Sequence, residues 1–194
     1  MNEVEQKYEQ KSKIWNLTKT WSEVYSEWFL RQDFQSIDVE EMVKKVKSYD
    51  KDTIACKSRV PKGQKDEVVE ALITKIKQVV ANIGVIQDLG NKAIQPRHWA
   101  KIFDHLEGNP YVEGRGFTLN QLIEDGVFRI KDVVEEISAV ASGEMSIETS
   151  LKEITEVWSK TKFETANYRD MRDRFIIGAI DDVMSQLEDH QVSI

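Results

Sequence analysis

The residues best suited to chemistry lie between Gly84 and His105, where glycines, a lysine and two histidines fall close together. A phosphate-binding loop needs the pattern G-x-x-x-x-G-K-[ST], in which backbone N–H groups and the lysine hold the phosphates. Here Gly84 and Gly90 are one residue too far apart for that pattern. Asn91 stands between Gly90 and Lys92, and an alanine replaces the hydroxyl that should follow the lysine. The sequence therefore predicts that this segment does not bind ATP.

The histidines, which are candidate metal ligands, are His98, His105 and His190. The first two are seven residues apart and could share one face of a helix. Zinc sites need cysteine, histidine or carboxylate ligands at characteristic spacings, and no such set surrounds this pair. We predict a packed, hydrogen-bonded His98, a His105 near the surface, and no metal site.

The single cysteine, Cys56, lies beside Lys57 and Arg59, whose charges favour the thiolate. A catalytic cysteine also needs a histidine base nearby, which the sequence does not place. An incidental thiol is therefore the preferred interpretation. One cysteine permits no disulfide within the chain, which fits a reducing compartment.

Adjacent carboxylates occur in three places, and each pair is typical of a solvated helix face or of a first helical turn, where the helix dipole favours negative charge. Nothing in their sequence context recommends a glycosidase-like pairing. The pairs are Glu135-Glu136, Asp181-Asp182 and Glu188-Asp189.

The net charge of −7 disfavours binding to nucleic acid and to anionic lipid. No apolar run approaches the roughly 20 residues that span a bilayer, and the polar N-terminus has no signal-peptide core. We expect a soluble, intracellular protein. The 40% hydrophobic and 31% charged fractions suit an elongated helical array, which exposes more surface per residue than a sphere.

The first expected helix covers about residues 3–30. Its apolar residues are spaced 3, 4, 3 and 4, which is a heptad seam. A long helix packed on its neighbours is favoured over a two-stranded coiled coil, because tryptophans fill a narrow seam poorly. The seam consists of Ile14, Leu17, Trp21, Val24 and Trp28, and Trp15, Tyr25 and Phe29 widen that face.

Capping residues and apolar spacing indicate the later helices. Asp38 and Thr118 can accept the free N–H groups at helix starts, and Pro96 suits a first helical position. Gly126 can end a helix, and residues 142–143 should end or kink the helix that begins near residue 129. Residues 107–116 are expected to be a loop. Residues 50–63 are expected to be a loop, or the end of a helix that frays before Pro61. The expected helices cover about residues 39–49, 66–83, 97–106, 118–124, 129–141, 147–158 and 179–191.

Residues 163–168 and 174–177 are predicted strands around a polar turn. A two-stranded hairpin alone is marginal, so it should lie on helices. The predicted fold class is mainly α, an elongated stack of helical bundles with one small β-hairpin near Phe163–Ile177. The residues expected to face inward from the last helix are Ile180, Val183, Met184 and Leu187.

The segment from Asp88 to Trp99 resembles a pattern of dynein heavy chains, D-L-x-N-x-A-[LI]-x-x-R-H-W. The residues 117–119 resemble the family's F-T-L. The residues 141–158 resemble its run A-x-x-E-x-x-[IL]-E-x-x-L-x-x-I-x-x-x-W. The chain departs from the family where Gly84, Gly90 and Lys92 stand. The motif residues singled out as structural or docking are Asn91, Arg97, His98, Trp99, Phe117, Glu144, Trp158 and Asp182.

The resemblance implies the dynein linker (N-terminal region 2), which in this family crosses the AAA+ ring and delivers the stroke during the ATPase cycle. It implies no enzyme activity and no cofactor in this fragment, because ATP and Mg are bound elsewhere in such chains. The implied partners are the AAA+ ring of the same chain and other dynein chains, with microtubules reached only through the full-length motor. Residues 117–119 and 175–178 resemble axonemal dyneins more than cytoplasmic ones. The resemblance therefore implies a location in the cytoplasm and cytoskeleton, in a cilium or flagellum.

The resemblance also suggests an organisation. Residues 1–60 would be tail-proximal N-terminal helices, and residues 61–194 a linker helical-bundle segment with the hairpin and a final helix. Trp99 is expected in the core, with Arg97 and His98 tying adjacent helices by hydrogen bonds or contacting the ring. The candidate hinges, which are otherwise ordinary caps and turns, are Gly84, Gly90, Gly143 and the loop through Gly116.

Two other functions stay open. The face formed by Trp15, Trp21 and Trp28 favours a helical docking module of the dynein tail that binds another dynein subunit or an axonemal protein. The third hypothesis is an unrelated hydrolase that uses Cys56 or the carboxylate pairs.

Overall fold

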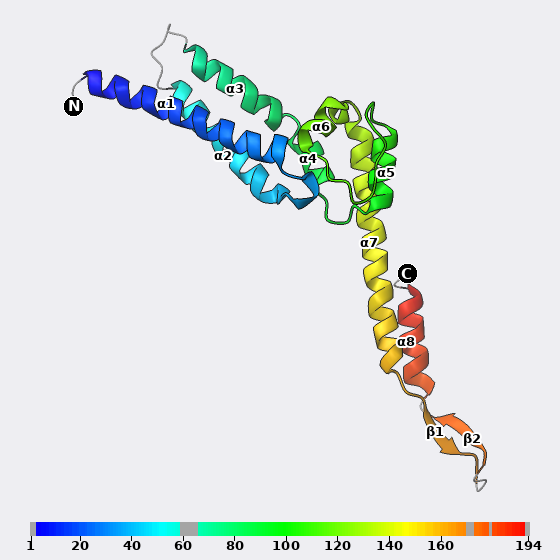
Figure 1. Cartoon of the computed structure of the whole chain (residues 1–194). Helices are drawn as coiled ribbons and strands as arrows, with labels where there is room; N and C mark the ends of the chain where they lie inside the picture. Colours follow the sequence, from blue (N-terminus) through cyan, green and yellow to red (C-terminus); the bar gives the residue numbers. More distant parts are fainter. Residues whose placement is uncertain (1–2, 59–65, 170–172, 179, 193–194) are drawn as a thin grey trace. The chain divides into compact units, whose positions relative to one another are not determined.

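The computed structural model of the chain describes residues 3–58, 66–169, 173–178 and 180–192, with side chains described from residue 8 onward. It is mainly α-helical with one small antiparallel hairpin, which confirms the predicted fold class (Figure 1). The chain divides into two compact units, Met1–Ala141 and Ser142–Ile194. The predicted boundary between residues 60 and 61 falls outside the described residues and stays a prediction.

The first helix departs from the predicted heptad spacing in its last turn. α1 (Glu3–Tyr25) continues into a π-helical turn, η1 (Ser26–Arg31). Trp21 is buried as the seam requires, but Phe29 takes the next core position with 1% of its surface exposed. Trp28, the seam residue, is half-buried. The wide turn is the reason for this shift by one residue.

The helix after the first connection is longer than predicted. α2 runs over Val39–Ser58, so of the two predictions for residues 50–58 the loop is wrong and the continued helix is correct. The polar stretch still has an inward face, where Thr53 is 1% exposed and donates its hydroxyl to the Tyr49 carbonyl at 2.6 Å. Residues 59–63 of the predicted loop lie outside the described residues. Asp38 caps this helix by accepting from the Glu41 N–H at 3.0 Å.

The central part of the chain follows the sequence signals closely. Pro96 is the first residue of its helix, the Thr118 hydroxyl accepts from the Gln121 N–H at 3.3 Å, and Gly126 adopts φ 92°. Positive φ strains residues with a Cβ, which explains the glycine. Residues 107–116 are non-helical, as predicted. The elements are α3 (Glu67–Val80), α4 (Ile83–Leu89), α5 (Pro96–Asp104), α6 (Leu119–Glu124) and η3 (Val127–Arg129).

One core joins these elements with α1, α2 and the following helix, α7 (Lys131–Lys160). Residues 142–143 were predicted to end or kink a helix, and an end there is wrong, because α7 is continuous and contains the segment 147–158. A helical glycine costs only about 1 kcal/mol relative to alanine, which the helix formers around Gly143 outweigh. The most deeply buried core residues include Met42, Ile76, Ile86, Ile102, Leu119, Leu122 and Val134.

The second unit contains the C-terminal part of α7, the strands β1 (Glu164–Asn167) and β2 (Phe175–Gly178), and α8 (Ile180–Val192). Thr165 lies opposite Ile177 in the antiparallel register. The indole N–H of Trp158 donates to Nδ1 of His190 at 3.0 Å and ties α7 to α8. The C-terminal part of α7 and α8 lie side by side in Figure 1. The expected inward face of α8 is not buried in the described structure: Ile180, Met184 and Leu187 are 47%, 47% and 41% exposed.

The hairpin prediction is correct in position but not in its packing. All four residues of β1 are exposed, and Phe175 of β2 is 65% exposed.

None of the helices in the described part of the chain has the length and apolar character needed to cross a membrane.

Candidate functional site

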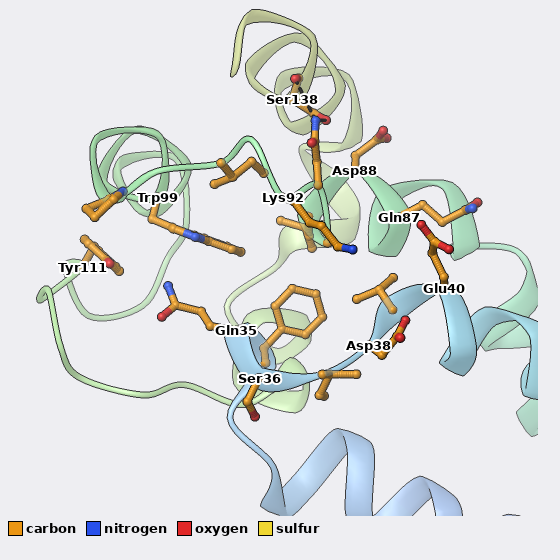
Figure 2. A pocket seen from close by; sticks show the side chains of 18 of the residues that line it. Gln35, Ser36, Asp38, Glu40, Gln87, Asp88, Lys92, Trp99, Tyr111 and Ser138 are labelled. Atoms are coloured by element: carbon orange, nitrogen blue, oxygen red, sulfur yellow. Dashed lines mark hydrogen bonds between the residues drawn. The ribbon is translucent and has the colours of Figure 1, made fainter. Parts of the chain in front are cut away.

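The residues of the first dynein-like motif surround an open cleft of about 1110 Å³ in the first unit (Figure 2). One wall comes from residues 34–40, the connection before α2 and the start of α2, and another from residues 87–96. Trp99 and Tyr111 lie at one end of the cleft, and Ser138 of α7 lies at the top of the view (Figure 2). The side chain of Lys92 extends into the cleft (Figure 2).

Asn91 joins the connection between α4 and α5 to α7. Its side-chain N–H group donates to the Ser138 carbonyl at 3.1 Å and to the Ser138 hydroxyl at 2.9 Å. Its side-chain oxygen accepts from the Ala93 N–H at 3.0 Å. Ser138 is 6% exposed, so these bonds lie where water competes poorly. Asn91 therefore holds two segments that are 47 residues apart in the chain.

His98 and Arg97 occupy the start of α5. His98 is 1% exposed, and its Nδ1 accepts from the Gln95 N–H at 3.1 Å, a bond that closes a capping box. The Arg97 guanidinium donates to Oε1 of Gln95 at 2.5 Å on the exposed side. These contacts shape the first turn of α5. The tie to adjacent helices expected of both residues stays a prediction.

Trp99 sits at the centre of an aromatic cluster. It is 5% exposed, and its ring meets Phe117 edge-on at 4.9 Å between centroids. Phe34 and Phe103 pack around the same indole at 6.1 and 6.4 Å. Aromatic pairs of this kind contribute about 0.5–1.5 kcal/mol beyond their buried area. The cluster joins the connection before α2, α5 and the loop before α6.

Asp33 anchors Phe117 and was not singled out from the sequence. The Phe34 N–H donates to the Phe117 carbonyl at 2.8 Å, and the Phe117 N–H donates to the Asp33 carboxylate at 3.2 Å. The same carboxylate accepts from the Gln35 N–H at 3.4 Å. An aspartate that bonds the backbone two residues on is a known turn signal, and that signal could have identified Asp33.

The cleft carries an excess of negative charge. Asp38, Glu40, Asp88 and Glu113 line it together with one cation, Lys92. Burial raises the pKa of the Asp88 carboxyl, and the nearby charge of Glu135 raises it further. Among the described ion pairs, none involves Lys92.

The lining offers no familiar catalytic arrangement. It contains two serines but neither histidine nor cysteine, so a serine there has no imidazole base. In the described part of the chain, no group of three histidine, cysteine or carboxylate side chains could hold a metal ion. His105 is exposed, and Cys56 is half-buried on α2. The hydrogen bonds and the aromatic cluster around the cleft join distant segments of the first unit.

The remaining motif residues, Glu144, Trp158 and Asp182, belong to the second unit. Glu144 is half-buried on α7, and Asp182 is exposed in the first turn of α8. Trp158 is the donor to His190 already described. Their functional role stays a prediction.

The three candidate hinge glycines differ in their surroundings. A Cβ at Gly90 would lie 2.5 Å from Cγ2 of Val39, so the close approach of α2 requires glycine there. A Cβ at Gly84 or Gly143 would meet nothing within 4 Å. Packing alone thus accounts for Gly90, and a hinge role at any of the three stays a prediction.

Comparison with known proteins places the whole chain in one family. The family model described as dynein heavy chain, N-terminal region 2, matches residues 1–194. Dynein axonemal heavy chain 6 of Homo sapiens is 29% identical over 194 residues, which are 100% of this chain and 5% of that protein. Dynein axonemal heavy chain 2 of Mus musculus is 29% identical over 184 residues, 93% of this chain and 4% of that protein.

Relatives with other names match as well. The dynein-1-beta heavy chain of the flagellar inner arm I1 complex of Chlamydomonas reinhardtii is 27% identical over 186 residues, 94% of this chain and 4% of that protein. The chain therefore spans about one twentieth of the length of these relatives. The ordered motifs, the helical fold and the full-length family match agree: this chain belongs to the dynein heavy chain family, as its N-terminal region 2.

Proposed function

We propose that this chain is a non-enzymatic mechanical element, the linker of a dynein motor. It transmits ATP-driven conformational change between the AAA+ ring and the tail of the same heavy chain. The ATP and Mg of such a motor are bound outside this fragment, and microtubules are reached only through the whole motor. Relatives named axonemal or flagellar support work in a cilium or flagellum.

The observation that carries this proposal is the set of long-range ties around the cleft. Asn91 with Ser138, and Asp33 with Phe117, join parts of the chain that are 47 and 84 residues apart. The aromatic cluster around Trp99 fills the space between these ties. A densely packed block of helices that hydrogen bonds hold together resists bending, so it can pass a displacement from one end to the other.

The test uses the full-length heavy chain that contains this segment. Asn91→Ala weakens the block without touching any nucleotide site, so we expect ATP hydrolysis to persist while microtubule gliding slows. The matched control is Asn120→Ala, which removes a hydrogen bond to Glu124 on the exposed side of α6. Equal loss of hydrolysis and gliding in Asn91→Ala would contradict a purely mechanical role.

A second measurement addresses enzyme activity in the fragment itself. The purified chain is expected to leave ATP unchanged, and Lys92→Ala is expected to make no difference. ATP hydrolysis by the fragment that Lys92→Ala abolishes would overturn the proposal, because Lys92 is the lysine closest to a phosphate-loop position.

A docking role on the tail is the second candidate, and the surface of α1 favours it. The predicted face of Trp15, Trp21 and Trp28 is not exposed as a whole, because Trp21 is buried and Trp28 is half-buried. Trp15 is 61% exposed, and Tyr8 on the same helix is 74% exposed. The predicted partner is another dynein subunit or an axonemal protein. Trp15→Ser should then abolish capture of that partner by the purified chain while leaving the unfolding midpoint unchanged. Undiminished capture by Trp15→Ser would exclude this surface.

A further inference from the structure

The end of α1 contains one residue more than an α-helix would use. In η1 the Gln32 N–H donates to the Glu27 carbonyl at 3.0 Å, five residues back, where an α-helix would reach four residues back. Wide turns of this kind are rare, occur as single turns within α-helices, and are frequent at functional sites. The turn lies immediately before Asp33, which is bonded to Phe117.

The wide turn decides which of two neighbouring aromatic residues enters the core. At 3.6 residues per turn, the residue seven positions after Trp21 lies on the same face, and that residue is Trp28. The structure instead buries Phe29, eight positions after Trp21, with 1% exposure. Trp28 remains half-buried beside α2, with the Lys45 ammonium 5.2 Å from its ring centroid. The π register therefore places Phe29 in the core, and the α register would place Trp28 there instead.

The core position has room for the larger indole ring. Phe29 stacks on Tyr25 with ring centroids 4.2 Å apart, and both line a largely apolar groove of about 820 Å³. Trp21, Ile123 and Phe128 line the same groove. If Trp28 replaced Phe29 in the core, the larger indole ring could extend into this open groove without displacing packed side chains.

We propose that residues 26–31 interconvert between the π register and the α register, a conformational device that does not depend on the linker assignment. In the α register, the extra residue moves out of the helix and into the extended connection at Gln32, whose φ and ψ are −80° and 140°. The connection between α1 and the Asp33 anchor then becomes one residue longer. The π turn holds this extra residue within the helix. Conversion to the α register releases it into the connection, which lets α1 move relative to the anchored loop while the core position stays filled.

The test follows Trp28 by ¹⁹F NMR in the full 194-residue chain labelled with 5-fluorotryptophan. Its resonance is assigned by its absence from Trp28→Tyr. Interconversion on the microsecond-to-millisecond timescale should appear as relaxation dispersion at Trp28. Trp15, exposed on the same helix, is the internal control and should show none.

Two variants make the result decisive. Deletion of Glu27 places Phe29 seven positions after Trp21, so a plain α-helix buries it and the dispersion at Trp28 should disappear. Phe29→Leu weakens the π register, so the Trp28 resonance should shift toward its buried position. A flat dispersion profile for Trp28 in the unmodified chain, with no shift in Phe29→Leu, overturns the proposal even if the deletion variant does not fold.

Discussion

Removal of the Asn91 side chain tests the tie between the α4–α5 connection and α7. Asn91→Ala deletes two hydrogen bonds to Ser138 and one to the Ala93 N–H, at 3.1, 2.9 and 3.0 Å. Each bond contributes about 0.5–1.5 kcal/mol net, and a buried group left without its partner adds about 1–3 kcal/mol. Because Ser138 is buried, we expect a loss of about 2–4 kcal/mol in the free energy of unfolding.

Urea unfolding followed by tryptophan fluorescence measures this loss, since Trp99 lies in the same block. The midpoint should fall by about 1–2 M for a slope near 2 kcal/mol/M. Asn120→Ala is the matched control: it removes one exposed bond to Glu124 at 2.8 Å and should change stability by less than about 0.5 kcal/mol. A double-mutant cycle with Ser138→Ala isolates the coupling. A coupling energy near zero, or equal effects of the two asparagine variants, would refute the reasoning.

Three further perturbations follow from the same region. Asp33→Ala removes the carboxylate that accepts from the Phe117 N–H and should lower unfolding stability by about 1–3 kcal/mol, as measured by urea unfolding. Gly90→Ala forces a Cβ against Val39 and should cost about 1–3 kcal/mol by overpacking, most of which Val39→Ala should restore in the thermal midpoint. Asp88 has a raised pKa when folded, so its favourable contribution is present in acid and is lost as pH rises through that pKa. Asp88→Asn should therefore be the more stable protein at pH 7, with an advantage that disappears in acid.

Helix positions were predictable wherever a single residue determines a helix end. Pro96, Thr118 and Gly126 act locally, through a fixed φ, a side-chain acceptor and a positive φ, so their effect is visible in the sequence itself. The polar stretch after Tyr49 left loop and helix open in the sequence, because its helix has only one buried face, on which Thr53 lies. α2 packs against α1 and α3, and the local sequence does not reveal these contacts.

The site was predictable only where motif and packing coincide. The dynein-like pattern contains Asn91 and Trp99, and both prove to be central to the ties and to the aromatic cluster. Asp33 and Ser138 carry no such pattern, and their importance arises from partners 84 and 47 residues away. The predicted apolar face of the first helix contained both Trp28 and Phe29, and only the three-dimensional structure reveals the wide turn that buries Phe29 more deeply. Trp15 was placed on that face wrongly, because it is 61% exposed.

The glycines show how packing narrows the hinge hypothesis. Gly90 is fixed by the approach of Val39, so its lack of a side chain is explained without any motion. Gly84 and Gly143 are different, because neither has a neighbour that excludes a Cβ. Gly143 lies in the interior of α7, where glycine costs about 1 kcal/mol relative to alanine, and Gly84 is the second residue of α4. Packing offers no reason for glycine at these two positions. A mechanical role that needs local compliance in α4 and α7 would supply one, so hinge motion in the proposed linker should be sought at Gly84 and Gly143 before Gly90.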